Sequence, residues 1–247
     1  MCFACRVVAR RLGLPLVPLQ PIRLCPLGGA LYSLLLRYKE SPVADDRRQC
    51  AAAVRALCRG YLVEAGDGLR VALGGSVDLV VPVPSTARPG PSPLARVDGL
   101  GRDVTGALPQ SVWAPLALQR RPETSAPTPP SHMRPDARGF SVSADAPTLA
   151  GCRVLLLDDL YVSGSRAQSA AAALRLAGAR AVVIVAVGRV LRPDRVPAHR
   201  AFLQRHARRG RELAENPGAM LRDPSLATPS TRRAGPPAPP RPRTARD

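Results

Sequence analysis

Blocks of apolar residues along the chain predict alternating helices and strands. Helices are expected at 30–39, 42–66, 94–108 and 165–177. In the second of these, apolar side chains recur at every third or fourth position, as one buried helix face requires. Aliphatic and β-branched runs predict strands at 77–84, 140–142, 153–157 and 181–187.

The clearest of these elements follow one another near the end of the apolar region. A strand at 153–157, a helix from Ser165 to Ala177 and a strand from Ala181 stand in that order, with Gly178 where a C-terminal helix cap belongs. This order is typical of a right-handed βαβ unit with parallel strands. We therefore expect an α/β protein with a central, mostly parallel sheet flanked by helices.

Composition divides the 247 residues into four parts. We set residues 1–27 apart as an extension and place the main domain at 28–192. A basic, partly helical extension is expected at 193–221. Residues 222–247 hold seven prolines and six arginines and almost no large apolar side chains. Such a segment cannot bury enough surface to offset its ordering entropy, so we expect a disordered tail.

The net charge of +18 comes almost wholly from arginine, because Lys39 is the only lysine. A strong positive field favours anionic partners, including nucleic acid at the basic tail. No apolar run approaches the roughly 20 residues of a membrane span, and no secretory signal is evident. We expect a cytoplasmic protein with no membrane partner.

Six cysteines in a chain of this size are expected to be reduced thiols. Cys2 and Cys5 have the spacing of half a zinc site, but a second pair with that spacing is missing. Structural zinc sites take four ligands, so zinc is not expected here. The extension at 1–27 is interpreted instead as a frayed or partly lost N-terminal element.

The most informative stretch is Asp158-Asp159 and the loop that follows. In an open parallel sheet, ligands bind outside the carboxyl ends of the strands. Gly164 lets the backbone approach an anion at the start of the next helix, where unpaired N–H groups favour phosphate. Ser163, Ser165 and Arg166 add two hydroxyls and a cation.

Two carboxylates beside a phosphate cradle need a partner of their own. Vicinal hydroxyls are a natural complement, and a nearby Mg²⁺ is another. A ligand that carries both a diol and a phosphate on one small ring is a ribose 5-phosphate. The simpler alternative is a strand-end turn in which one aspartate caps the helix.

This stretch resembles the PRPP-binding loop of the type I phosphoribosyltransferases. The resemblance implies that Asp158 and Asp159 contact the ribose hydroxyls in catalysis. It also implies a 5-phosphate cradle made by Val162, Ser163, Gly164, Ser165 and Arg166. Val162 and Arg166 stand where the family usually has threonine.

Further segments resemble the ComF family of competence-associated, amidophosphoribosyltransferase-like proteins. They are Leu34–Lys39, the Val81-Pro82-Val83-Pro84 strand end and the stretch from Arg134 to Val142. The resemblance implies a pyrophosphate site at Ser85, Thr86, Ala87, Arg88 and Lys39. An exposed proline-rich loop is the alternative for the first four, and a solvated lysine for the last.

The resemblance implies a PRPP-binding protein that transfers phosphoribosyl groups to an unknown acceptor, with Mg²⁺ bound alongside PRPP. Whether the chain is an active enzyme stays open at this point. The alternative is a non-catalytic relative that acts in DNA uptake or nucleotide sensing through its basic surface. A homodimer is also left open.

Overall fold

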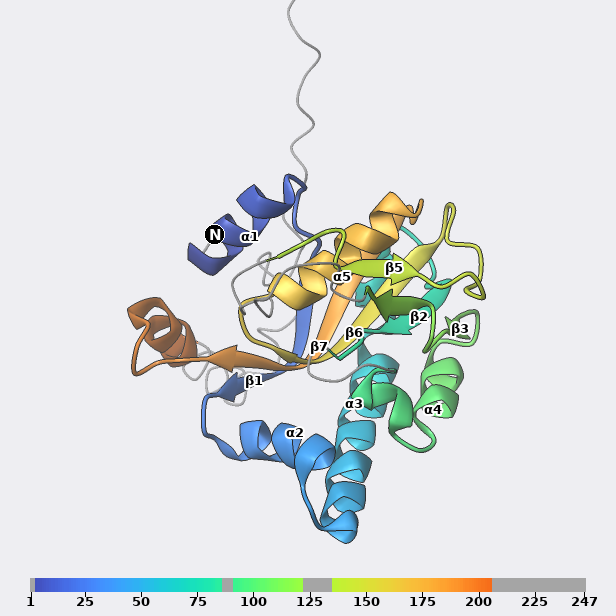
Figure 1. Cartoon of the computed structure of the whole chain (residues 1–247). Coiled ribbons are helices and arrows are strands. Elements are labelled where there is room, and N and C mark those ends of the chain that lie inside the picture. Colours follow the sequence, from blue (N-terminus) through green and yellow to red (C-terminus); the bar gives the residue numbers. More distant parts are fainter. Residues whose placement is uncertain (1–2, 86–90, 122–134, 206–247) are drawn as a thin grey trace, which may run out of the picture. The chain divides into compact units, whose positions relative to one another are not determined.

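The computed structural model describes residues 3–85, 91–121 and 135–205 (Figure 1). In chain order its elements are α1 (Phe3–Leu12), β1 (Leu19–Pro26), α2 (Ala30–Glu40), α3 (Ala44–Leu73), β2 (Leu79–Pro82), the short 3₁₀ helix η1 (Pro93–Arg96), α4 (Leu100–Ala107), β3 (Val112–Trp113), β4 (Leu118–Arg120), β5 (Phe140–Val142), β6 (Arg153–Tyr161), α5 (Ser165–Leu176) and β7 (Ala181–Leu191).

In the described part of the chain, five strands form the central sheet in the order β1-β7-β6-β2-β3, and every neighbouring pair is parallel. A separate antiparallel pair joins β4 to β5. The predicted fold class, a mostly parallel sheet flanked by helices, is therefore confirmed.

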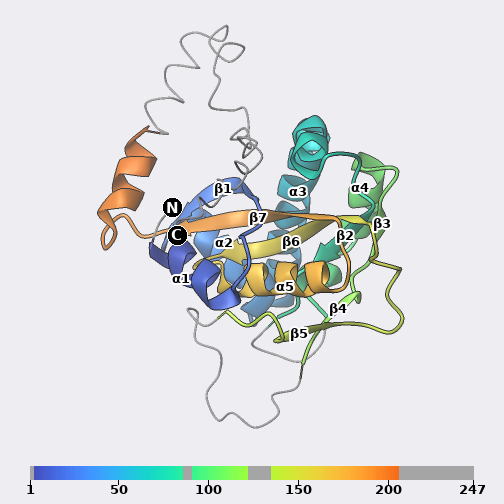
Figure 2. The same ribbon diagram turned by 90° about the horizontal axis from the view of Figure 1, so that it is seen from above.

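Helices cover both faces of the sheet (Figure 2). Leu155 and Leu157 of β6 pack with residues of α3 such as Leu62 and Leu69 in one hydrophobic core. Leu156 points to the opposite face and packs in a second core with Leu174 of α5. Because successive strand residues face opposite sides, a strand buried on both faces must be apolar throughout, as this stretch of β6 is.

The predicted βαβ unit is present as β6, α5 and β7. Helix α5 ends before Gly178, whose φ of 96° is in the left-handed region that glycine tolerates. The alanine-rich sequence of α5 is mostly buried, because small side chains let this helix lie close against the sheet. Both strands extend beyond the predicted bounds, to Tyr161 and Leu191.

Several other boundaries differ from the predictions. Helix α3 continues through Gly66 to Leu73, since buried Leu69 and Leu73 hold its last turns in the core. The helix predicted at 94–108 is instead divided into η1 and α4, because Gly99 takes a φ of 72° between them. Strand β2 is shorter than predicted, at Leu79–Pro82.

Residues 1–27, which the sequence set apart, contribute a strand to the main sheet. β1 is an edge strand that pairs with β7 from Leu19↔Ile184 to Pro26↔Leu191. The predicted tail at 222–247 and most of the extension at 193–221 lie outside the described residues. Among the described helices, none combines the length and apolar character needed to cross a membrane.

Candidate functional site

The connections that leave β2 and β6 run to opposite sides of the sheet, although the two strands are parallel neighbours. The connection after β2 leads through α4 to β3 on one side, whereas the connection after β6 leads through α5 to β7 on the other. Open parallel sheets bind ligands outside the carboxyl ends of the strands at such a switch point. Leu157, the residue before the acidic pair, is aligned with Pro82 there.

The acidic pair lies within β6 and not in a turn after it, which corrects the predicted strand end at residue 157. Pairing with β2 stops at Leu157, but pairing with the longer β7 continues through Asp158↔Ala186 and Leu160↔Gly188. At the acidic pair, β6 is therefore paired with a neighbouring strand on one side only, that of β7. Both side chains are nearly inaccessible, at 3% and 4% exposure.

Two cations neutralise the two buried carboxylates. Arg166 of α5 donates through Nη2 to Asp158 Oδ1 at 2.6 Å and to Asp159 Oδ1 at 3.2 Å. Lys39 Nζ lies 2.7 Å from Asp159 Oδ2, and the Tyr38 hydroxyl donates to the same oxygen. Buried charges require such partners, because desolvation of an unpaired ion in a protein interior costs on the order of several kcal/mol.

The two carboxyls have opposite pKa shifts. Burial raises the pKa of Asp158, and the attraction of Arg166 opposes that rise only in part. Burial also acts to raise the pKa of Asp159, but Lys39 and Arg166 outweigh it, so the pKa is lowered. As pH falls, Asp158 is therefore the member of the pair that takes up a proton first.

The loop from Val162 to Ser165 leads directly into the N-terminus of α5. The Ser165 N–H donates to Ser163 Oγ at 3.3 Å, and the two hydroxyl oxygens are 3.2 Å apart. Val162 is 37% exposed, so the side chain at this position faces solvent. First-turn N–H groups of a helix lack intrahelical acceptors and attract anions, which is the property that a phosphate cradle needs.

Gly164 occupies the N-cap of α5 with a φ of 85°. A β-carbon built on it would overlap the hydroxyl and ring of Tyr161. The backbone conformation and the close tyrosine both require glycine at this position.

The structure brings together Asp158, Asp159, Arg166 and Lys39 among the residues predicted from sequence. Arg166 contacts the acidic pair, whereas the resemblance implied a place at the 5-phosphate. Lys39 contacts Asp159, whereas the resemblance implied a place at the pyrophosphate. Ser85 lies just beyond the end of β2. Thr86, Ala87 and Arg88 lie outside the described residues.

Tyr38 is the site residue that the sequence analysis missed. Its ring is nearly buried, its hydroxyl donates to Asp159, and Lys39 Nζ lies 5.5 Å from its ring centroid. A tyrosine beside the only lysine of the chain, near the end of an amphipathic helix, was the available signal. Burial and the negative charge of Asp159 raise the Tyr38 pKa, so its hydroxyl stays protonated and donates.

Within the described ranges, no three His, Cys, Asp or Glu side chains gather where they could hold one metal ion. Cys2 lies outside these ranges, whereas Cys5 lies on α1. The acidic pair already has two cationic partners. A divalent ion at this site would therefore depend on ligand oxygens for most of its coordination.

Neither a protein-family model nor a curated protein matches the chain. Among solved structures, the chain is similar to a hypoxanthine phosphoribosyltransferase from Staphylococcus aureus in two crystal forms, with 11% and 12% identity and TM-scores of 0.35. These alignments cover 55% and 56% of this chain, and 73% and 74% of that enzyme. The AQ2163 protein from Aquifex aeolicus is 12% identical, with a TM-score of 0.38 over 69% of this chain and 87% of that protein.

Proposed function

We propose that this protein binds PRPP, or another ribose 5-phosphate ligand, at the carboxyl end of β6. One observation carries the proposal. Two adjacent carboxylates lie at the switch point of a parallel sheet, and a glycine in the left-handed region then leads directly to a helix N-terminus. The carboxylates are suited to accept hydrogen bonds from a diol, and the helix start is suited to hold a phosphate.

Phosphoribosyl transfer is the activity that we propose for this site. The bond from ribose C1 to the pyrophosphate oxygen would break as positive charge develops on the ring, and an acceptor would form the new bond at C1. Asp158 and Asp159 would hold the ring and stabilise that charge, while the loop fixes the phosphate. Mg²⁺, bound mainly by ligand oxygens, would neutralise the leaving pyrophosphate.

Calorimetric titration with ribose 5-phosphate, and with PRPP plus Mg²⁺, tests the binding site. We expect saturable binding of both ligands. Asp158→Asn should weaken ribose 5-phosphate binding by about tenfold or more, as expected for loss of a charge-assisted hydrogen bond. The variant should stay folded, because asparagine has nearly the same shape as aspartate and Asp159 remains as an acceptor for Arg166.

Asp45→Asn is the matched control, since Asp45 is an exposed residue of α3 and its loss changes the net charge equally. Equal affinity in the wild type and in Asp158→Asn, with both proteins folded by circular dichroism, would refute the assignment of the acidic pair.

A second candidate is a non-catalytic protein of the same architecture, such as a ComF-like protein in DNA uptake or nucleotide sensing. The contacts of Arg166 favour it, because this side chain occupies carboxylate oxygens that a ribose diol would need. Pyrophosphate release distinguishes the two candidates. Release from PRPP in a mixture of nucleobases and amines supports transfer, whereas PRPP binding without release supports a binding role.

A further inference from the structure

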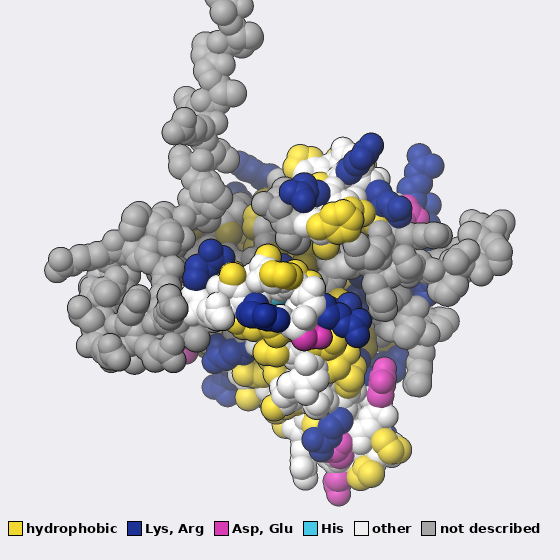
Figure 3. All heavy atoms as spheres, turned by 90° about the vertical axis from the view of Figure 1, so that its left-hand side faces the viewer, with side chains coloured by type: hydrophobic (Ala, Val, Ile, Leu, Met, Phe, Trp, Pro, Cys, Tyr) yellow, Lys and Arg dark blue, Asp and Glu magenta, His cyan; other side chains and the backbone are white. Residues whose placement is uncertain are grey.

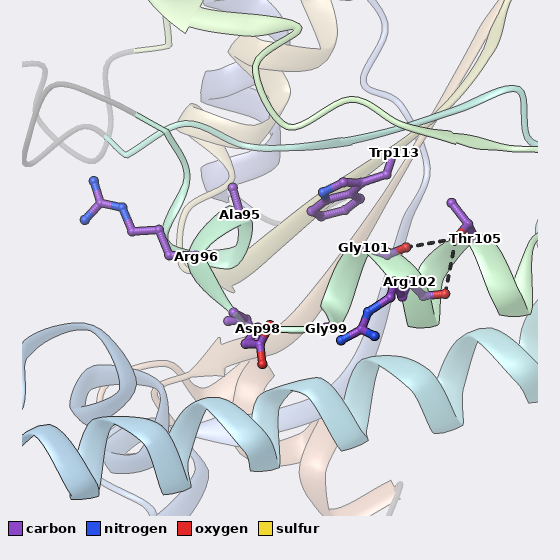
Figure 4. A pocket seen from close by; sticks show the side chains of 9 residues that line it. Ala95, Arg96, Asp98, Gly99, Gly101, Arg102, Thr105 and Trp113 are labelled. Atoms are coloured by element: carbon purple, nitrogen blue, oxygen red, sulfur yellow. Dashed lines mark hydrogen bonds between the residues drawn. The ribbon is translucent and has the colours of Figure 1, made fainter.

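A pocket of about 580 Å³ opens between η1, α4 and the edge strand β3 (Figure 4). This volume lies in the range of roughly 300–1,000 Å³ that is usual for small-molecule sites. Strand β2 separates β3 from β6 in the sheet, so the pocket does not belong to the acidic pair. The pocket is lined by Ala95, Arg96, Val97, Asp98, Gly99, Gly101, Arg102, Thr105 and Trp113.

Trp113 provides an aromatic surface in this pocket. The indole lies against the start of α4, where a β-carbon on Gly101 would come within 2.8 Å of Trp113 Cδ1. Glycine at that position lets the helix backbone support the ring. The side chain remains partly exposed to the pocket, which is the arrangement of an aromatic platform on which a planar ring can stack.

The wall opposite the indole is anchored from α3. Arg55 forms a two-pronged ion pair with Asp103, with Nε–Oδ2 and Nη2–Oδ1 distances of 2.6 and 3.0 Å. It also donates to the Asp98 carbonyl at 3.3 Å and packs directly on Gly99, whose φ is 72°. The turn that starts α4 is thus fixed before any ligand binds, which lowers the entropic cost of binding.

The rim of the pocket carries a net positive charge. Arg96 extends from η1 and Arg102 from α4, and their side chains point to different sides of the pocket (Figure 4). Among the described residues of the lining, Asp98 is the only acidic one. Both arginines are exposed, so their guanidinium groups are accessible to a ligand. Guanidinium groups match the geometry of phosphate oxygens and can bind them through two hydrogen bonds. The pocket therefore combines a site for a planar ring with a site for an anion.

We propose that this pocket binds a nucleotide, with the base stacked on Trp113 and the phosphate held at the rim by Arg96 or Arg102. The nucleotide is either a free mononucleotide or one unit of a single strand, since both offer the same base and phosphate. This binding is independent of the ribose-phosphate site on β6.

Trp113 is the only tryptophan in the chain, so intrinsic tryptophan fluorescence reports on this pocket alone. We expect saturable quenching of the full-length protein by AMP, by an oligo(dA) single strand, or by both. Quenching by AMP identifies a free nucleotide as a sufficient ligand. Quenching by the oligonucleotide but not by AMP identifies a single strand as the ligand. No quenching by either ligand overturns the proposal.

Paired charge variants test the phosphate-binding role of the two rim arginines. Arg96→Gln with Arg102→Gln should raise the ligand concentration at half-maximal quenching by about tenfold or more, because both guanidinium groups are removed. Arg70→Gln with Arg180→Gln removes the same charge from exposed positions elsewhere and should leave that midpoint nearly unchanged. Equal effects of the two double variants would show that the binding is general electrostatic attraction, and would overturn the proposal.

Three variants separate this pocket from the site on β6. Asp158→Asn should leave the quenching midpoint unchanged, whatever its effect on ribose 5-phosphate. Trp113→Leu, measured by calorimetry in the Asp158→Asn background so that the site on β6 contributes little, should weaken AMP or oligonucleotide binding by about tenfold, the effect expected from losing one stacked base. Trp113→Phe keeps an aromatic ring and should retain most of the affinity. If Asp158→Asn abolished quenching while the double variant Arg96→Gln with Arg102→Gln kept it, the nucleotide would be bound on β6 and the proposal would be overturned.

Discussion

Gly164 shows how a single residue sets the geometry of the candidate phosphate loop. Its positive φ turns the chain from β6 into α5, and the missing side chain leaves room for Tyr161. Tyr161 is itself buried, and the Arg189 guanidinium lies 5.4 Å from its ring centroid. The tyrosine therefore has little freedom to move away from a larger residue at 164.

We expect Gly164→Ala to destabilise the protein more than Gly151→Ala. Both glycines have a similar positive φ, 85° and 77°, and alanine in that conformation costs about 1–2 kcal/mol. Only residue 164 adds an overlap with Tyr161, because no atom beyond the adjacent residues lies within 4 Å of a β-carbon at Gly151. Urea unfolding of both variants measures the difference. Equal losses of unfolding free energy would mean that Tyr161 moves aside without cost.

At the scale of elements, the charged cluster joins three parts of the chain that are distant in sequence. Helix α2 supplies Tyr38 and Lys39, strand β6 supplies both aspartates, and helix α5 supplies Arg166. Among the described residues the cluster is electrically balanced, with two carboxylates and two cations. Removing one member leaves a buried charge without its partner, which is far more costly than removing a matched pair.

Arg166→Met should therefore lower the free energy of unfolding by about 2–4 kcal/mol, near the lower end of the range for buried pairs because Arg166 retains 29% exposure. Adding Asp158→Asn should recover much of the loss, since the unpaired carboxylate is also removed. Chemical denaturation measures both effects. Arg48→Met, which breaks an exposed pair with Asp45 on α3, is the control and should change stability little. A double variant as unstable as Arg166→Met would contradict a balanced cluster.

The elements with strong local signals were predictable from the sequence. The unit β6-α5-β7 follows from apolar runs, a helix-favouring segment and a glycine cap, all close together in the chain. Edge strand β1 was missed because its Leu19–Pro26 sequence contains two prolines and acquires its partner only through β7. The split between η1 and α4 depends on the φ of Gly99, which Arg55 of α3 helps to fix.

The candidate site was predictable only in part, because local patterns in the sequence do not encode contacts between distant segments. Asp158, Asp159 and the loop are contiguous, so their common location could be inferred from the motif. The pairing of Lys39 and Arg166 with those carboxylates depends on how α2 and α5 pack around β6, which no local pattern encodes. Trp113 and its pocket likewise arise from three elements that meet only in the fold.

At the scale of the whole molecule, positive charge is widely distributed. Figure 3 shows Lys and Arg side chains scattered over one face among hydrophobic and other residues. Residues 206–247 hold nine arginines against four acidic residues, a net charge of +5 that leaves +13 of the total +18 on residues 1–205. Any general attraction to nucleic acid should therefore come from both parts of the chain.

Any binding of the full chain to duplex DNA should weaken, but not disappear, when residues 206–247 are deleted. The slope of log K against log salt should become shallower by about 0.9 for each DNA phosphate that these residues neutralise. Ribose 5-phosphate affinity should stay the same, because every described residue of that site precedes the deletion. Filter binding between about 50 and 200 mM salt measures the slope. An unchanged slope and affinity would remove these residues from any role in DNA binding.

The parallel pairing of β1 with β7 has a consequence for synthesis of the protein. Residues 19–26 are synthesised well before their hydrogen-bonding partners at 184–191, which follow much later in the chain. The first strand must therefore wait with its edge unpaired, exposed to association with other nascent chains. Completion of the sheet is a late event that closes a very long loop, so high contact order should make this step slow.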